Sequence, residues 1–152
     1  MNRGFTTVGV FHPKREVNIG GLWRAATIYG ASQVFTVGAR YHRQAADTPK
    51  TPQNIPLVHF ADIDDLVAHL PWSTPLVGVE LVEAATSLTA FEHPVRACYL
   101  LGAEDHGLPP AVLKRCHQLI QIPAPRLISH NVATAGALVL HDRYVKSPEA
   151  GR

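Results

Sequence analysis

Three short polar stretches contain the side chains that are best suited to chemistry. They cover residues 18–24 (NIGGLWR), 102–108 (GAEDHGL) and 129–136 (SHNVATAG). The first joins an amide and a guanidinium to two glycines, the second sets two carboxylates between glycines, and the third joins a hydroxyl to an amide. The paired glycines predict the start of a helix, which favours phosphate and other anions. Each stretch alone is equally compatible with an ordinary turn or helix cap.

The second stretch follows an apolar run over residues 97–101, which is typical of a strand buried on both faces. Pro109 and Pro110 then fit the start of a helix, where a missing N–H costs nothing. The bend between them would place Glu104 and Asp105 at the carboxyl edge of a sheet. In open α/β proteins that edge is where ligands bind.

Apolar runs and their periodicity predict strands that alternate with helices. The expected strands cover residues 7–11, 33–37, 57–60, 76–81, 97–101 and 119–122. The last helix, over about 131–145, is apolar on nearly every side in its first half, so we expect it to pack against the sheet, a second subunit or both. This order predicts an α/β fold with a parallel sheet flanked by helices. Residues 38–56, with three prolines, are expected to form a long and functional surface loop.

The composition suits one domain with its own core, because the chain has 152 residues and is 46% hydrophobic. No apolar run reaches membrane-spanning length and the N-terminus has no signal-peptide core, so we expect a cytoplasmic protein that does not enter a membrane. Cys98 and Cys116 are expected to be free thiols, not a disulfide or metal site.

Charge is unevenly distributed along the chain. Residues 1–50 hold seven Lys and Arg against two acids, and residues 106–152 hold six against two. Residues 51–105 hold eight acids against one Arg. If the two basic ends meet, they form a positive surface suited to a polyanion; otherwise they are ordinary solvated charges.

In this order and at these separations, the three stretches resemble the motifs of the SpoU (TrmH-type) branch of the SPOUT superfamily. Its members are RNA 2′-O-ribose methyltransferases that use S-adenosylmethionine. They show N-x-G-x-x-x-R near the N-terminus, G-x-E-x-x-G after a late strand, and S-L-N-V-A at the start of the last helix. All three are matched, and the resemblance spans about residues 7–145. His130 departs from the third motif, and segment 123–128 is shorter than in many members and lacks their glycine.

The resemblance implies one methyltransferase domain over residues 1–152, with a core of about 7–145 and no separate RNA-binding extension. It also implies a deep trefoil knot made by the C-terminal segment and, together with the apolar last helix, a homodimer. No metal is expected, because metal sites need clustered ligands. The substrate would be tRNA, or else rRNA, and the methyl group would go from S-adenosylmethionine to a ribose 2′-hydroxyl.

The resemblance further assigns residues to roles. Those expected to serve catalysis match the motifs: Asn18, Arg24, Glu104, Ser129 and Asn131. Those expected to bind the cofactor follow three strand ends or open the last helix: Val79, Glu80, Gly102, Ala103, Glu104, Ile122, Leu127, Ser129 and Asn131. Those expected to bind RNA are basic residues of the N-terminal third: Lys14, Arg15, Arg24, Arg40 and Arg43.

A guanidinium stays protonated near neutral pH, so we expect Arg24 to bind a phosphate or stabilise a developing alkoxide and not to act as a base. Asn18 would position Arg24 or the RNA, and Glu104 would hold its own loop or a substrate hydroxyl. One alternative is a non-catalytic RNA-binding protein on the same fold. Another is a nucleotide-binding α/β enzyme, although the chain has no P-loop or dinucleotide fingerprint.

Overall fold

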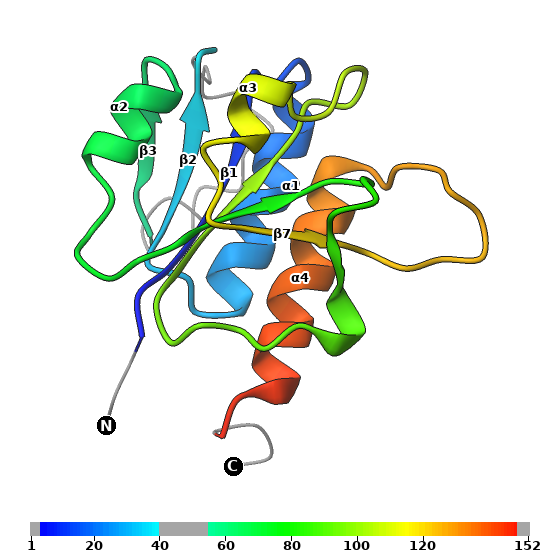
Figure 1. Cartoon of the computed structure of the whole chain (residues 1–152). Coiled ribbons are helices and arrows are strands. Elements are labelled where there is room, and N and C mark those ends of the chain that lie inside the picture. The colour runs from blue at the N-terminus through cyan, green and yellow to red at the C-terminus, as the bar shows by residue number, and fades with distance from the viewer. Residues whose placement is uncertain (1–3, 40–54, 149–152) are drawn as a thin grey trace.

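The computed structural model describes residues 4–39 and 55–148, and within them seven strands form one sheet (Figure 1). All strand pairs are parallel. In spatial order the strands are β3 (Leu57–Phe60), β2 (Gln33–Val37), β1 (Thr6–Phe11), β6 (Ala97–Leu101), β4 (Leu76–Val79), β7 (Gln118–Gln121) and β5 (Thr86–Ser87). The predicted parallel sheet is confirmed. β5 escaped prediction because two residues carry no periodicity.

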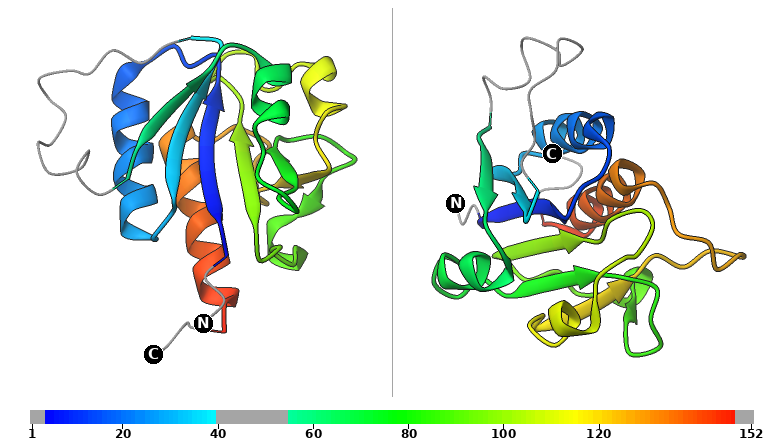
Figure 2. Two further views of the ribbon diagram at one scale, coloured as in Figure 1. Left: turned by 90° about the vertical axis from the view of Figure 1, so that its left-hand side faces the viewer. Right: turned by 90° about the horizontal axis from the view of Figure 1, so that it is seen from above.

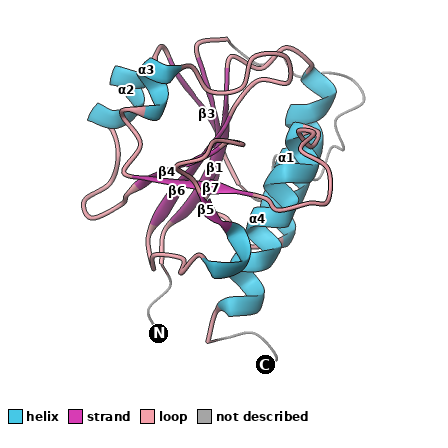
Figure 3. Ribbon diagram, turned by 45° about the vertical axis from the view of Figure 1, so that its right-hand side comes forward, coloured by secondary structure: helices cyan, strands magenta, loops and turns pink. Residues whose placement is uncertain are grey.

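Helices cover both faces of the sheet (Figure 2). α1 (Glu16–Ile28) and α4 (Val132–Lys146) lie side by side on one face, and α2 (Ile63–Ala68) and α3 (Pro110–Leu113) lie on the other (Figure 3). A short 3-10 turn, η2 (Leu88–Ala90), precedes β6. The α/β fold expected from the sequence is therefore confirmed. Within the described ranges, no helix is long and apolar enough to cross a membrane.

The central strand β6 supplies both apolar cores. All five of its residues are buried. Tyr99 and Leu101 point into the core beneath α1 and α4, whereas Cys98 and Leu100 point into the core beneath α2 and α3. This alternation is what a strand covered on both faces requires. Cys98 and Cys116 are free thiols, as predicted, and burial raises the pKa of Cys116 to about 11.

α1 begins four residues before the paired glycines at positions 20 and 21, which corrects the predicted helix start. Its N-cap residue, Arg15, makes no side-chain capping bond, so no capping residue marks the start in the sequence. Glu16 stands in the first turn, where the helix dipole favours a carboxylate. The glycines lie inside the helix, and the prediction that they form an anion-binding helix end is wrong.

α4 approaches α1 closely through its small residues. An added Cβ at Gly136 would lie 2.2 Å from Cδ1 of Leu22, so the α1 side chain rests against the α4 backbone. Val139, on the same side of α4, is fully buried. Thr134 and Leu138, on the other side, are exposed. The predicted burial of the helix is thus confirmed within the chain for one face, and the other face is exposed in the single chain.

A buried polar cluster fixes the C-terminal half of α4. The His93 side chain is 5% exposed, its Nδ1 lies 2.6 Å from the Tyr99 hydroxyl, and its Nε2 lies 2.8 Å from Asp142 Oδ2. Arg143 donates to the Tyr99 oxygen at 3.1 Å. The Tyr99 proton is therefore available to His93 Nδ1, and the ring's other nitrogen donates to Asp142. This arrangement suits a neutral imidazole.

Cations extend the same anchorage to the loop before β6. Arg143 donates to the carbonyls of Pro94 at 2.6 Å and Val95 at 2.7 Å. Lys146 donates to the carbonyl of Leu88 at 2.6 Å. Charge-assisted bonds of this kind are the stronger ones, so the end of α4 is firmly tied to this segment.

We expect His93 to make the stability of the fold depend on pH. Burial lowers the pKa of His93 from its ordinary value of 6.5, although the hydrogen bond to Asp142 opposes this. The unfolded chain therefore takes up a proton first. The contribution of a neutral His93 is complete above pH 6.5 and is lost as the pH falls toward the folded-state pKa.

The measurement is urea unfolding of wild type and His93→Gln at pH 7.5, 6.5 and 5.5. The wild-type free energy of unfolding should fall more steeply with acidification, by up to about 1.4 kcal/mol per pH unit, because that is the limit for one proton. Parallel pH profiles for the two proteins would contradict the assignment.

Candidate active site

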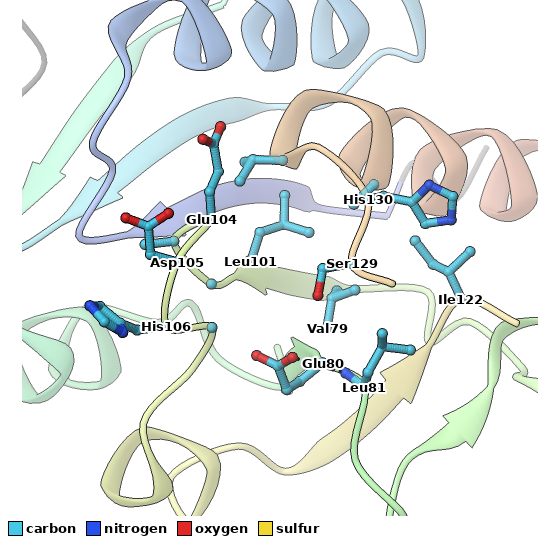
Figure 4. Close-up of a pocket in the computed structure, with 15 residues that line it drawn as sticks. Val79, Glu80, Leu81, Leu101, Glu104, Asp105, His106, Ile122, Ser129 and His130 are labelled. Carbon is cyan, nitrogen blue, oxygen red and sulfur yellow. Dashed lines mark hydrogen bonds between the residues drawn. The ribbon is translucent and has the colours of Figure 1, made fainter. Parts of the chain in front are cut away.

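The carboxyl ends of β4, β6 and β7 surround a cavity of about 280 Å³ (Figure 4). Seven of the nine residues expected at the cofactor line it: Val79, Glu80, Gly102, Ala103, Glu104, Ile122 and Ser129. In Figure 4, Glu104 and Asp105 lie on one side of the cavity, Ile122 and His130 on the other, and Ser129 between them.

Two expected residues lie outside the cavity. Leu127 is 85% exposed, on a segment between β7 and α4 that is exposed throughout residues 123–130. Asn131 caps α4, because its Oδ1 accepts from the backbone N–H groups of Ala133 and Thr134. The structure thus gives Asn131 the role of a helix cap, which the third stretch also allowed.

Several lining residues escaped the sequence analysis as site residues: Leu81, Leu101, Asp105, His106, Gly107, His130, Val132 and Ala135. Most are immediate neighbours of motif residues in the sequence, and this adjacency could have identified them as lining residues. Val132 and Ala135 read as helix core from the sequence alone. They line the cavity because the first turns of α4 form one of its walls.

Glu80 holds the loop between β6 and α3. Its Oε2 accepts from the backbone N–H of Leu108 at 2.7 Å, and its Oε1 accepts from that of Leu81 at 3.0 Å. Gly107 has φ +60°, and an added Cβ there would lie 2.1 Å from Glu80 Oε2. Only glycine fits this combination of left-handed backbone and close approach. The role of holding this loop, expected of Glu104, belongs to Glu80.

Gly102 serves the same loop. The N–H of Gly107 donates to the carbonyl of Ala103 at 2.9 Å, which folds the loop back on itself. An added Cβ at Gly102 would lie 2.4 Å from the carbonyl carbon of Gly107. The glycine is therefore required by the loop's own fold.

Glu104 presents a different environment. Its Oε2 lies 3.5 Å from Nε of Arg15. Its Oε1 is buried and has no hydrogen-bond partner among the residues that the structure describes. An unpaired carboxylate oxygen is costly to bury, so this atom is suited to accept a bond from a ligand at the cavity.

Asn18 joins the first stretch to the third. It is buried, and its Oδ1 accepts from Nδ2 of Asn131 at 2.9 Å. The bond spans 113 residues of sequence and sets the start of α4 against the first turn of α1. The two side-chain amides thus position α1 relative to α4, and neither residue lines the cavity.

The basic residues expected at RNA differ in their surroundings. Nζ of Lys14 lies 2.6 Å from Oδ2 of Asp105, and this bond lowers the pKa of that carboxyl. Arg24 lies on the exposed side of α1, outside the cavity and without a hydrogen bond or ion pair to any described residue. Arg40 and Arg43 lie outside the described residues.

The family of this chain follows from a match to one family model. The family model described as the SpoU rRNA Methylase family matches residues 6–141. The chain belongs to the SpoU rRNA methylase family. A curated relative, the 23S rRNA (guanosine-2'-O-)-methyltransferase RlmB of Acinetobacter baylyi, is 25% identical in an alignment of 135 residues that covers 82% of this chain and 53% of the relative. The chain thus spans about half the length of that relative.

Solved structures share the fold of this SpoU chain. One, from work on the 2-OH methylation of C/U34 on tRNA, has a TM-score of 0.81 at 19% identity and covers 95% of this chain and 97% of that one. The AdoMet-bound rRNA methyltransferase from Sinorhizobium meliloti has a TM-score of 0.79 at 24% identity, over 93% of this chain and 56% of that one. At these identities the likeness establishes the fold alone.

We expect Glu80→Ala to loosen the loop that carries the second motif of this SpoU chain. The change removes both acceptors, so the N–H of Leu108 loses its partner and the free energy of unfolding should fall by about 1–3 kcal/mol. Hydrogen exchange should accelerate in the peptide that contains residues 102–108.

Glu83→Ala is the matched control, because Glu83 is an exposed carboxylate three residues away with no bond to a described residue. It should leave exchange in this peptide unchanged. Equal exchange in wild type and Glu80→Ala would show that the loop holds itself without Glu80.

Proposed function

We propose that this protein methylates a ribose 2′-hydroxyl of RNA, tRNA or else rRNA, with S-adenosylmethionine as the methyl donor. The observation that carries the proposal is the cavity at the carboxyl ends of β4, β6 and β7, because the second and third motifs of the family build its walls. The curated relative is named as a 23S rRNA (guanosine-2'-O-)-methyltransferase, which supports the reaction type.

The cavity residues fit the proposed cofactor. When bound, S-adenosylmethionine supplies a methyl group already activated on a sulfonium. Its cationic groups suit a carboxylate, and the buried Oε1 of Glu104 has a free lone pair for a donor. Val79 and Ile122 offer apolar surface for the adenine, and the Ser129 hydroxyl adds a polar contact. The volume of about 280 Å³ is near the lower end for small-molecule sites.

We propose that the protein is a homodimer whose interface is the joint face of α1 and α4. Exposed residues form one stripe along each helix at the spacing i, i+4, i+7, i+11. The stripes consist of Val17, Gly21, Arg24 and Ile28 on α1, and of Thr134, Leu138, His141 and Val145 on α4. The four large apolar members are 37–74% exposed. Two adjoining stripes of this kind favour burial against a second copy.

Arg24 stands in the middle of the α1 stripe, so in such a dimer it would lie where the two subunits meet. We propose that it contacts the RNA there and stabilises the alkoxide that develops on the 2′-oxygen. Its lack of an ion pair with the described residues leaves its donors available for this role. Lys14 and Arg15, at the cavity rim, would contact RNA phosphates, with Arg40 and Arg43 as further contacts.

We also propose that the chain acts as one methyltransferase domain in the cytoplasm and that its C-terminal segment is threaded as a deep trefoil knot. The family affiliation and the shared fold of the solved structures support this threading. An experimental structure with an unthreaded C-terminal segment would overturn it.

The test of the function uses S-adenosylmethionine with an isotopically labelled methyl group and separate pools of tRNA and rRNA. Mass spectrometry of the nucleosides should find the label on ribose 2′-oxygens. In single-turnover assays Arg24→Ala should lose about two orders of magnitude or more in rate, because a charge-assisted contact to the transition state is gone. Arg24→Lys should recover little, since an ammonium does not copy a planar fork.

Calorimetry with S-adenosylhomocysteine should give wild-type affinity for Arg24→Ala, because Arg24 lies outside the cavity. Arg115→Ala is the control for the loss of an arginine: Arg115 pairs with Asp64 on the α2–α3 side of the sheet, so its loss should leave both the rate and the affinity unchanged. A wild-type rate in Arg24→Ala would remove Arg24 from the mechanism. Cofactor binding with no labelled RNA in either pool would favour the non-catalytic RNA-binding alternative.

The dimer is tested by light scattering. Wild type should have twice the 16.6 kDa mass of the chain, and Ile28→Asp combined with Leu138→Asp should shift it to the monomer, because charges on an apolar interface oppose burial. Trp72→Asp is the control: Trp72 is 90% exposed but lies between α2 and β4, away from the stripes. A monomeric wild type would overturn the dimer.

A further inference from the structure

His12 has an unusual backbone at a conspicuous place. It follows the last residue of β1 and has φ +49°, in the left-handed region that side chains rarely adopt. Pro13 comes next, and a proline pushes the residue before it toward extended backbone. Asn or Gly would occupy this position with less strain. Strain of this kind, held by the surrounding structure, points to a use for the side chain.

The imidazole ring of His12 packs against Gly38. An added Cβ at Gly38 would lie 2.3 Å from Nε2 of His12, so only glycine leaves room for the imidazole. The backbone N–H of His12 donates to the carbonyl of Val37 at 2.8 Å. The Phe11 ring packs edge-on, with its centroid 4.5 Å from that of the imidazole. Two neighbouring strands thus fix the ring in one orientation.

The imidazole itself remains available. His12 is exposed, and its ring nitrogens have no hydrogen bond to any residue within 4–39 or 55–148. A histidine that served only the fold would be expected to bury its ring or satisfy its nitrogens. Here the fold holds the ring in place and leaves it open to solvent.

The position faces the candidate active site. β1 pairs with β6, so His12 stands at the same sheet edge as the loop that carries Glu104 and Asp105. Lys14, two residues on, bonds to Asp105 and so draws this turn to the rim of the cavity. A polyanion that contacts Lys14 would pass over or beside the imidazole.

We propose that His12 is a stacking platform for a nucleobase of the RNA substrate, and this rests on the proposed function. Aromatic side chains held in a fixed plane are a common way to bind unpaired bases, and an imidazole stacks in this way. Because the imidazole is already held against Gly38, little side-chain entropy is lost when a base stacks on it. His12 would therefore help to select an unpaired nucleotide near the target ribose.

The first test compares three variants for affinity toward the RNA pool that the wild type methylates. His12→Ala and His12→Asn should weaken binding about tenfold, because one stack is lost, whereas His12→Phe should stay within about threefold of wild type. Asn accepts left-handed backbone readily, so a purely structural role predicts wild-type affinity for His12→Asn. The slope of affinity against salt should not change, since stacking releases no counterions.

The second test moves the ring without changing it. Gly38→Ala should weaken RNA binding as His12→Ala does, because the new Cβ displaces the imidazole. Gly30→Ala is the matched control: both glycines have a positive φ, +87° at Gly38 and +71° at Gly30, but an added Cβ at Gly30 meets nothing within 4 Å. Thermal unfolding of both variants separates a loss of fold from a loss of binding. Affinity for S-adenosylhomocysteine should be unchanged throughout.

The outcomes separate the two proposals. If the wild type methylates RNA and His12→Asn binds RNA equally well, the platform is overturned and the function stands. If His12→Ala reduces the salt slope by about one unit, His12 is a phosphate contact and the platform is overturned. If the wild type methylates no RNA, the function and the platform fall together. Loss of binding in His12→Asn and Gly38→Ala, with retention in His12→Phe and Gly30→Ala, supports the platform.

Discussion

The parallel direction of all strand pairs decides where the chemistry of this protein can lie. Parallel neighbours cannot be joined by a tight hairpin, so each connection must cross the sheet, and helices come to cover both faces. The same constraint brings the carboxyl ends of β4, β6 and β7 to one edge, where their loops enclose a cavity. Residues far apart in sequence meet there: the bond between Lys14 and Asp105, at the rim of the cavity, spans 91 residues of sequence.

Local patterns in the sequence predicted most strands, because an apolar run such as 97–101 has few alternatives once it is bounded by a glycine. The start of α1 was not predictable in this way, because Arg15 provides no capping side chain. The role of Glu80 was hidden for another reason. Its bond to Leu108 spans 28 residues, and no local pattern encodes a contact between two loops.

Opposite charges at the rim of the cavity explain why net charge says little about function here. Lys14 pairs with Asp105, and Arg15 lies near Glu104, so the basic turn and the acidic loop partly neutralise each other. Lys14, Arg15 and Asp105 are exposed, and ion pairs made by such groups contribute little to stability and are screened by salt. The two cations are therefore bound weakly enough for a phosphate to compete for them.

α4 is held at both of its ends, and this determines which part of the cavity can adapt. Asn131 ties its start to α1, and Arg143 ties its end to the loop before β6. Val132 and Ala135, between these anchors, form a fixed wall. Segment 123–130 enters from β7 and is exposed at every residue, so few contacts fix its course. Proteins of this fold can therefore differ in segment 123–130, and so in how this wall of the cavity contacts a ligand, without any change in the positions of α1 and α4.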